Sequence, residues 1–432
     1  MSWTETSLLY GVLLLACLAG GVGIGAAMGL VGIVGVTLAS GTALWPTLAD
    51  LVWNTTTNFN LVAIPLFVLM GELVLQGGVA SRFYTGIAGL FRRVPGGLAQ
   101  TNIAGCAIFS AIAGSSVTTA MTVGSVAIAE MRRRGYDDRL TLGTLTAGGC
   151  LGILIPPSIP LIVYSSMTQE SVIDLFMAGL VPGLLLALVF SAFVAVKAWR
   201  QPGLLPGRGA AAAFALRPFL RDAFPIVLLI SLIIASMYFG VVTPTEASGF
   251  GCLLAFLMAC AYRQMTVQKL ARALRNTLMT SAVIMFIVVC AQLLNFAVVS
   301  SGIGHNLAEA LTALDVPPFV FFLLLFAIYL VVGMFIDGLS IMLLTVPLLY
   351  PTCIAMGFDG VWLGILIVVF IELGALTPPM GLNLFAIQSI APGRTLGDVA
   401  WSSAPYAALV AAFAFLLYFC PGIVLWLPAA MK

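Results

Sequence analysis

The sequence predicts an all-α polytopic membrane protein, built as an inverted-topology repeat with two re-entrant hairpins and two broken helices. Three observations predict this fold: the composition, the distribution of basic residues and a match between the two halves. Of the 432 residues, 61% are hydrophobic and 8% are charged, and the mean hydropathy is +1.14. A soluble protein of this size could not bury so much apolar surface, so most of the chain must lie in lipid. Long apolar segments without two-residue alternation favour helices over a barrel.

Basic residues predict which side of the membrane each loop occupies, because they resist translocation out of the cytoplasm. They cluster at Arg82, Arg92–Arg93, Arg132–Arg139, Lys197–Arg221 and Arg263–Arg275. With these clusters inside, seventeen of the eighteen basic residues face the cytoplasm, and both chain ends lie on the opposite side. The predicted spans cover residues 7–20, 24–40, 59–77, 140–168, 172–198, 222–242, 247–262, 278–300, 361–390 and 399–427.

Two stretches do not fit as ordinary spans. Residues 94–131 have arginines at both ends, so they must enter from the cytoplasm and return to it. Residues 316–350 lie between Asp315 and Asp359 and must enter and return from the outside. Each arm has about 17 residues, near the lower limit for a full crossing. Since both stretches turn on small polar residues, we expect re-entrant hairpins whose tips lie at membrane depth, beside protein or water.

The two halves match each other at one constant offset along the chain. Gly135-Tyr136-Asp137 pairs with Gly357-Phe358-Asp359, and the same shift superposes Ser115 on Asp337. LGILIPPS, at residues 151–158, matches LGALTPPM, at residues 373–380. Because one hairpin opens inward and the other outward, the repeat is predicted to be inverted in topology, a building plan of secondary transporters.

Each repeat carries a Pro-Pro pair in the middle of a predicted span. A proline removes an amide donor and clashes with the preceding turn, so a pair should break the helix, although a simple kink satisfied by neighbours is the alternative. Pro157 and Pro379 are then expected in the first turn of the second half-helices. Such a break frees carbonyls, for example those of Ile155 and Thr377, and amides that follow them. Carbonyls favour a cation and amides favour an anion.

Hairpin tip and broken helix of one copy should face each other and form two polar sites. An unpaired carboxylate in the bilayer is costly, so Asp337 suggests a bound cation, with sodium as the expected ion and a proton as its rival. Oxygen ligands suit a hard ion. The first predicted sodium site comprises Ser115, Ser116, Thr119, Ile155 and Ser158, and is neutral. The second comprises Asp337, Ser340, Thr377 and Met380. Glu72 and Glu372 are interpreted as buried structural hydrogen-bonding groups.

The helix dipoles at Ser158 and Met380 suit a substrate carboxylate. The predicted substrate-binding residues are Ser116, Ser158 and Asn383. Four-carbon diacids, keto acids and sugar acids all remain open.

The chain resembles the large membrane subunit of TRAP transporters, the tripartite ATP-independent periplasmic carriers, along nearly its whole length. The resembling stretches are AIPLFVLMGE (63–72), AIAGSSVTTAMTVGS (111–125), LGILIPPSIPLIVYS (151–165), LFMAGLVPGLLL (175–186), GVVTPTEAS (240–248), GMFIDG (333–338) and GALTPPMGLNLF (374–385). The resemblance implies an elevator-type transporter of the bacterial inner membrane, in which the distribution of basic residues makes both termini periplasmic. It also implies sodium-driven uptake of an organic acid, a separate small four-helix membrane subunit and a soluble periplasmic binding protein.

The expected domain organisation follows from the repeat and the resemblance. Scaffold helices and an arm occupy residues 1–93, a scaffold helix and cytoplasmic linker 171–221, scaffold helices and arms 222–315, and a C-terminal helix 393–432. The first part of the transport domain is 94–170, with its hairpin at 94–131 and broken helix at 140–168; the second is 316–392, with its hairpin at 316–350 and broken helix at 361–390. Amphipathic stretches at Val79–Arg92 and Val267–Thr277 should lie on the membrane surface.

Other functions find less support in the sequence. The single histidine, His305, lies in a predicted surface segment. No histidine is therefore expected within the membrane to ligate a haem or to form a Ser-His pair. No Walker-type motif is present, so ATP is not expected as the direct energy source. We expect no enzyme activity, no cofactor other than sodium as coupling ion, and no nucleic-acid partner. A channel, an integral membrane enzyme subunit and a stand-alone proton- or sodium-coupled carboxylate carrier remain alternatives.

Overall fold

The computed structural model describes residues 2–205, 219–313 and 316–431. Most of the predicted linker Gln201–Leu216, and the flanking residues Asp315 and Lys432, lie outside these ranges. Within them every regular element is helical, which confirms the all-α prediction. Seven of the described helices are long and apolar enough to cross a membrane.

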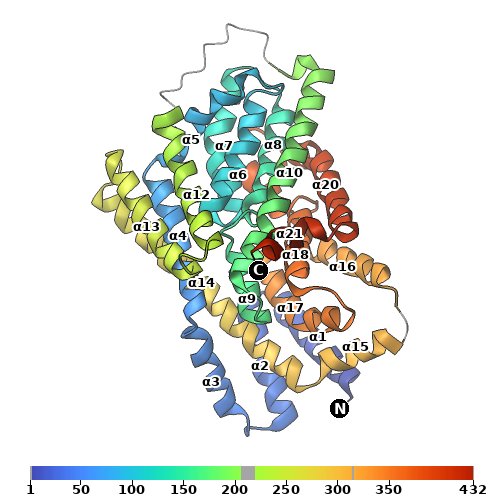
Figure 1. The fold of residues 1–432 in the computed structure, drawn as a ribbon. Coiled ribbons are helices and arrows are strands. Elements are labelled where there is room, and N and C mark those ends of the chain that lie inside the picture. Colours follow the sequence, from blue (N-terminus) through green and yellow to red (C-terminus); the bar gives the residue numbers. More distant parts are fainter. Residues whose placement is uncertain (1, 206–218, 314–315, 432) are drawn as a thin grey trace.

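The element order of the first half recurs in the second, with α14 at the positions that match both α3 and α4 and with α21 added at the end (Figure 1). The first half contains α1 (Trp3–Ala19), α2 (Ile24–Ser40), α3 (Trp45–Thr56), α4 (Ala63–Gln76), α5 (Val79–Ala88), α6 (Leu98–Ala113), α7 (Ser116–Arg133), α8 (Asp138–Gly149), α9 (Ile159–Thr168) and α10 (Val172–Arg200). The second contains α12 (Phe224–Tyr238), α13 (Pro244–Ala261), α14 (Val267–Ser300), α15 (Ile303–Ala313), α16 (Pro318–Gly333), α17 (Gly338–Ala355), α18 (Gly360–Ala375), α19 (Leu382–Ile390), α20 (Leu396–Phe419) and α21 (Gly422–Ala430). Helices α7 and α17 begin and end at positions related by the same offset that was found in the sequence.

The two predicted hairpins are helix-turn-helix pairs. Helices α6 and α7 form the first and turn at Gly114–Ser115; α16 and α17 form the second and turn at residues 334–337. In Figure 1 the first pair lies above the second. Capping explains why both second arms begin where they do: Ser115 and Asp337, which the repeat superposes, are the N-cap residues of α7 and α17.

Both predicted broken helices are interrupted at their proline pairs. The first runs from α8 to α9 and the second from α18 to α19. The expectation that Pro157 and Pro379 open the second half-helices is wrong. Helix α9 begins only after Ser158, and Pro160 takes the favoured first-turn position. Helix α19 begins after Gly381, whose φ of +54° lies in the region that only glycine adopts freely.

Each hairpin packs closely against the broken helix of its own half. A Cβ on Gly152 would stand 2.6 Å from the Cα of Ser116, so this glycine lets the break contact the first tip. A Cβ on Gly374, the equivalent position, would stand 2.6 Å from the Cα of Gly333 on the second hairpin. The backbone amide of Gly381 also donates to the Met334 carbonyl at 3.1 Å. Hairpin turns and helix breaks therefore form one packed unit in each half.

Three elements differ from the sequence-based expectations. Residues 267–277, predicted as a separate surface helix, are continuous with the following span in α14, 34 residues long. Helix α3 was not predicted. The predicted C-terminal span 399–427 is divided into α20 and α21 around Cys420 and Pro421, because a proline cannot continue the hydrogen-bonding pattern of a helix.

Candidate functional site

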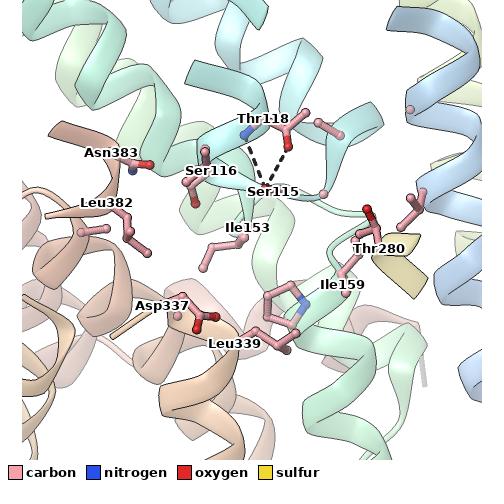
Figure 2. A pocket seen from close by; sticks show the side chains of 18 of the residues that line it. Ser115, Ser116, Thr118, Ile153, Ile159, Thr280, Asp337, Leu339, Leu382 and Asn383 are labelled. Carbon is pink, nitrogen blue, oxygen red and sulfur yellow. Dashed lines mark hydrogen bonds between the residues drawn. The ribbon is translucent and has the colours of Figure 1, made fainter. Parts of the chain in front are cut away.

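A cavity of about 240 Å³ lies where the two hairpin turns meet the helices α4 and α14 (Figure 2). Its polar lining comes from four directions. The first hairpin contributes Ser115, Ser116 and Thr118; the second contributes Asp337; α18 and α19 contribute Glu372 and Asn383; α4 and α14 contribute Glu72 and Thr280. All other lining residues are apolar or glycine, and none of the lining residues is basic.

The first hairpin presents the N-terminus of α7 to the cavity. The hydroxyl oxygen of Ser115 accepts hydrogen bonds from the Thr118 backbone amide at 3.5 Å and from the Thr118 hydroxyl at 3.3 Å (Figure 2). An N-cap serine of this kind satisfies one of the free amides of the first helical turn. The remaining amides give this end of α7 a partial positive charge at the cavity wall.

The second hairpin presents the N-terminus of α17 in the same way. A carboxylate oxygen of Asp337 accepts from the Ser340 backbone amide at 3.1 Å. The Asp337 side chain is exposed to the cavity, whereas the sequence argument treated it as a buried and unpaired carboxylate. Contact with the helix N-terminus and access to the cavity both reduce the cost of its charge. A cation is therefore not required for folding at this position, but the carboxylate is accessible to one.

Glu372 is the carboxylate that is buried. Its side chain is 1% exposed. It accepts a short hydrogen bond from the Ser116 hydroxyl and another from the Asn383 amide nitrogen at 3.2 Å. Its backbone oxygen lies 3.8 Å from the sulfur of Cys150, its equivalent in the first half. Glu372 thus joins the first hairpin to α18 and α19 of the second half, in agreement with a buried hydrogen-bonding group.

Of the residues predicted for the first ion site, Ser115 and Ser116 line the cavity. Thr119 is fully buried, and its hydroxyl has no hydrogen-bond partner. Ser158 is also fully buried and donates to the Ile153 carbonyl at 2.6 Å, and Ile155 is buried. The last three residues lie behind the cavity wall.

Of the residues predicted for the second ion site, Asp337 alone lines the cavity. Ser340 is fully buried and its hydroxyl is unpartnered. The Thr377 hydroxyl donates to the Leu373 carbonyl at 2.6 Å, and Met380 is exposed. Asn383, predicted for the substrate, lines the cavity, but its amide nitrogen is already used by Glu372.

Sequence reasoning missed the contribution of the wall opposite the hairpins. Thr280 on α14 lines the cavity, and so does Glu72 on α4, which was interpreted as buried but is only half-buried. Glu72 accepts from Asn276 at 3.1 Å and from Gln76 at 3.3 Å. The contact between Glu72 and Asn276 joins residues 204 positions apart, and no local pattern in the sequence predicts it.

The fold is that of a membrane transporter. A solved transporter, YdaH of Alcanivorax borkumensis, superposes with a TM-score of 0.67 at 14% identity, covering 89% of each chain. MtrF of Neisseria gonorrhoeae, described with a class of antimetabolite efflux pumps, superposes with a TM-score of 0.61 at 14% identity, over 89% of this chain and 85% of that one.

Comparisons of sequence identify the family to which the chain belongs. Residues 11–423 match the model of the tripartite ATP-independent periplasmic transporter, DctM component, and the chain belongs to this family. It is 35% identical to the C4-dicarboxylate TRAP transporter large permease protein DctM of Pseudomonas aeruginosa, over 88% of this chain and 89% of that one. It is 34% identical to the sialic acid TRAP transporter large permease protein SiaM of Vibrio cholerae, over 77% and 78%. A third relative, at 27% identity, is the longer isethionate TRAP transporter permease protein DctMQ of Oleidesulfovibrio alaskensis, of which the matched part is 63%.

Membership confirms the resemblance seen in the sequence. The chain is a multi-pass membrane protein and a large permease of the TRAP type, and this family comprises transporter permeases rather than enzymes. Membership of this family implies association with a small membrane subunit and a periplasmic binding protein.

Proposed function

We propose that this permease carries out sodium-coupled uptake of an organic acid delivered by a periplasmic binding protein. The observation that carries the proposal is the pair of hairpin tips, at equivalent positions of the two halves, that present Ser115 and Asp337 to one cavity. Helix N-termini at both tips suit anionic groups, and the oxygen-rich side chains beside them suit a hard cation.

The charges of the cavity support coupling to a cation. Its lining includes Glu72, Asp337 and Glu372 and no basic side chain. An acid would therefore enter a site that is already negative, unless cations accompany it. An ion drives transport only through a difference in affinity between states, and a site that binds the acid well only with sodium present has such a difference.

The ion sites are proposed at the residues predicted from the sequence. Ser115, Ser116, Thr119, Ile155 and Ser158 would hold the first sodium ion, and Asp337, Ser340, Thr377 and Met380 the second. The unpartnered and buried hydroxyls of Thr119 and Ser340 support this assignment, because a buried hydroxyl is otherwise paired in nearly all proteins. Ser116, Asn383 and Ser158 are proposed for the substrate.

An elevator movement is proposed for alternating access. The cavity lies between α4 and α14 on one side and the hairpin turns on the other. We assign α4 and α14 to the scaffold and residues 94–170 and 316–392 to the moving domain, so that the cavity lies on the sliding surface. The small membrane subunit would be a separate chain that supports the scaffold, in the bacterial inner membrane, with both termini of this chain periplasmic.

The names of the relatives indicate the class of substrate. They refer to C4-dicarboxylates, sialic acid and isethionate, which are all organic acids. We propose an organic acid on this basis. A stand-alone proton- or sodium-coupled carrier that needs no binding protein is the second candidate.

Uptake into proteoliposomes tests these proposals. The permease would be reconstituted with its small subunit and given labelled acids together with the matching binding protein. Uptake that requires an inward sodium gradient and the binding protein is expected. Uptake on a proton gradient with no sodium on either side contradicts sodium coupling, and full uptake without the binding protein supports the stand-alone carrier.

A further inference from the structure

The first hairpin tip has no carboxylate of its own, but it contacts one from the other half of the chain. Ser116 donates to Glu372, which is 1% exposed. The other side-chain donors beside this carboxylate, the Asn383 amide and the Cys150 thiol, are also neutral, and no basic residue lines the cavity. A charged carboxylate buried among neutral donors is costly, so Glu372 is neutralised either by a proton or by a cation close by.

Asn383 has an oxygen with no partner. An ionised carboxylate only accepts hydrogen bonds, so the amide nitrogen of Asn383 is the group that faces Glu372. The amide oxygen is then turned away, and in this fully buried residue it has no hydrogen-bond partner. Asn383 is one of the residues around the cavity, and this buried oxygen is an acceptor left without a donor beside the first hairpin tip.

Ser116 offers a second oxygen at the same place. Its hydroxyl hydrogen points to Glu372, so the lone pairs of the oxygen remain free. Ser116 and Asn383 lie next to each other in Figure 2, and each bonds to a different oxygen of the one carboxylate. They also meet beside Gly149, where an added Cβ would stand 3.3 Å from the Ser116 carbonyl oxygen and 3.6 Å from the Asn383 side-chain carbonyl carbon.

We propose that the first sodium site is completed by the second half of the chain. The side-chain oxygens of Asn383 and Ser116 are ligands of the ion, and Glu372 neutralises its charge; in this assignment Asn383 serves the ion in place of the substrate role given above. Oxygen ligands beside one carboxylate are the environment that a hard monovalent cation prefers. The first site is then not neutral, and each of the two sodium ions has one carboxylate. This assignment rests on the proposed sodium coupling.

Glu372→Gln tests the assignment. A glutamine has nearly the same size but no charge, and its amide can donate to Asn383, which removes the free oxygen as well. The permease with its small subunit would be purified, and its thermal stabilisation by sodium measured without substrate. We expect the sodium concentration for half-maximal stabilisation to rise roughly tenfold or more, the effect of losing a charged partner. The Hill coefficient for sodium in uptake should fall toward that of a transporter with one site fewer.

Glu170→Gln is the matched control. Glu170 is a partly buried glutamate outside the cavity, and it accepts from the Tyr350 hydroxyl at 2.7 Å, which a glutamine oxygen can also do. Its sodium response should equal that of the unmodified protein. A Glu372→Gln protein with unchanged sodium affinity and Hill coefficient overturns the assignment.

Two further outcomes are distinguishable. If Glu372→Gln does not yield a monodisperse complex, Asn383→Ala carries the same expectation, and unchanged sodium affinity in that variant overturns the assignment. If the unmodified complex shows neither sodium stabilisation nor sodium-dependent uptake, the proposed sodium coupling itself is contradicted.

Discussion

The two hairpin tips have the same backbone and different chemistry. Ser115 and Asp337 occupy equivalent positions, and each caps a helix that begins at the following residue. The first tip is neutral and contacts Glu372 from the other half, whereas the second carries its own carboxylate. Helix capping fixes the shared geometry, and the charge of each site is free to come from either half.

The two helix breaks also differ in their surroundings. All residues from 151 to 160 are buried, whereas Pro378, Pro379 and Met380 are exposed. The first break is covered by α10, where a Cβ on Gly179 would stand 2.6 Å from the Leu154 carbonyl. In α20 of the second half, the equivalent of Gly179 is Trp401, whose side chain cannot approach a backbone so closely. Glycine at position 179 therefore lets α10 pack against the first break.

The largest expected effect on sodium-dependent uptake is at the second hairpin tip, which carries the carboxylate of Asp337. Asn is as good a helix cap as Asp, so Asp337→Asn keeps the α17 cap and removes only the charge. We expect sodium-dependent uptake to be abolished, or sodium affinity to fall by more than about 30-fold, since a close charge pair near a protein surface is worth several kcal/mol. The measurement is uptake into proteoliposomes against sodium concentration.

The control is Asp359→Asn, which makes the same exchange at the cap of α18. Asp359 accepts a hydrogen bond from the Trp362 amide at 2.9 Å and does not line the cavity. Its sodium dependence should be unchanged. Unaltered sodium dependence in Asp337→Asn would remove Asp337 from the second site.

A smaller effect is expected where the breaks contact the hairpins. Gly152→Ala places a Cβ 2.6 Å from the Cα of Ser116, so the first tip itself must shift, at a cost of about 1–3 kcal/mol. We expect the sodium affinity to fall by roughly tenfold. Gly374→Ala collides with Gly333, which lies four residues before the cap Asp337, and should lower sodium affinity less.

Gly249→Ala on α13, where a Cβ meets nothing within 4 Å, is the control for the methyl group. Sodium titrations of thermal stability compare the three variants. Equal effects of Gly152→Ala and Gly374→Ala would contradict the expectation that an added methyl group matters more where it meets the tip residue itself.

Much of this architecture could be predicted from the sequence because it depends on local signals. Paired prolines predict the helix breaks, and caps such as Asp137 and Asp359 predict where the broken helices begin. The constant offset between the halves identified which elements correspond. By contrast, the start of α9 at Ile159 depends on Pro160 rather than Pro157, a choice between two neighbouring signals that the pattern alone did not decide.

The candidate site could be predicted only in part. The tips Ser115 and Asp337 stand out because polar residues interrupt apolar segments. The contact of Ser116 with Glu372 spans 256 positions, and that of Glu72 with Asn276 spans 204. Such contacts depend on how helices pack, and local patterns in one half of the sequence do not predict which residues of the other half they contact. The exposure of Asp337, which differs from the expectation, and the hydrogen-bond partners of the buried Glu372 arise from this packing.

The smallest expected effect on sodium affinity is at the first hairpin tip, where the carboxylate comes from Glu372 of the other half. Ser115→Ala removes the cap of α7, which accepts from Thr118, at a cost of about 1 kcal/mol. We expect a fall in sodium affinity of roughly fivefold, far below that of Asp337→Asn, because the neutralising charge on Glu372 remains. Ser115→Asn restores a neutral cap and should recover most of the affinity, as measured by sodium titration of uptake. If Ser115→Ala were as damaging as Asp337→Asn, or if Ser115→Asn failed to recover, the role of Ser115 would extend beyond capping, and the two tips would be chemically more alike than their side chains indicate.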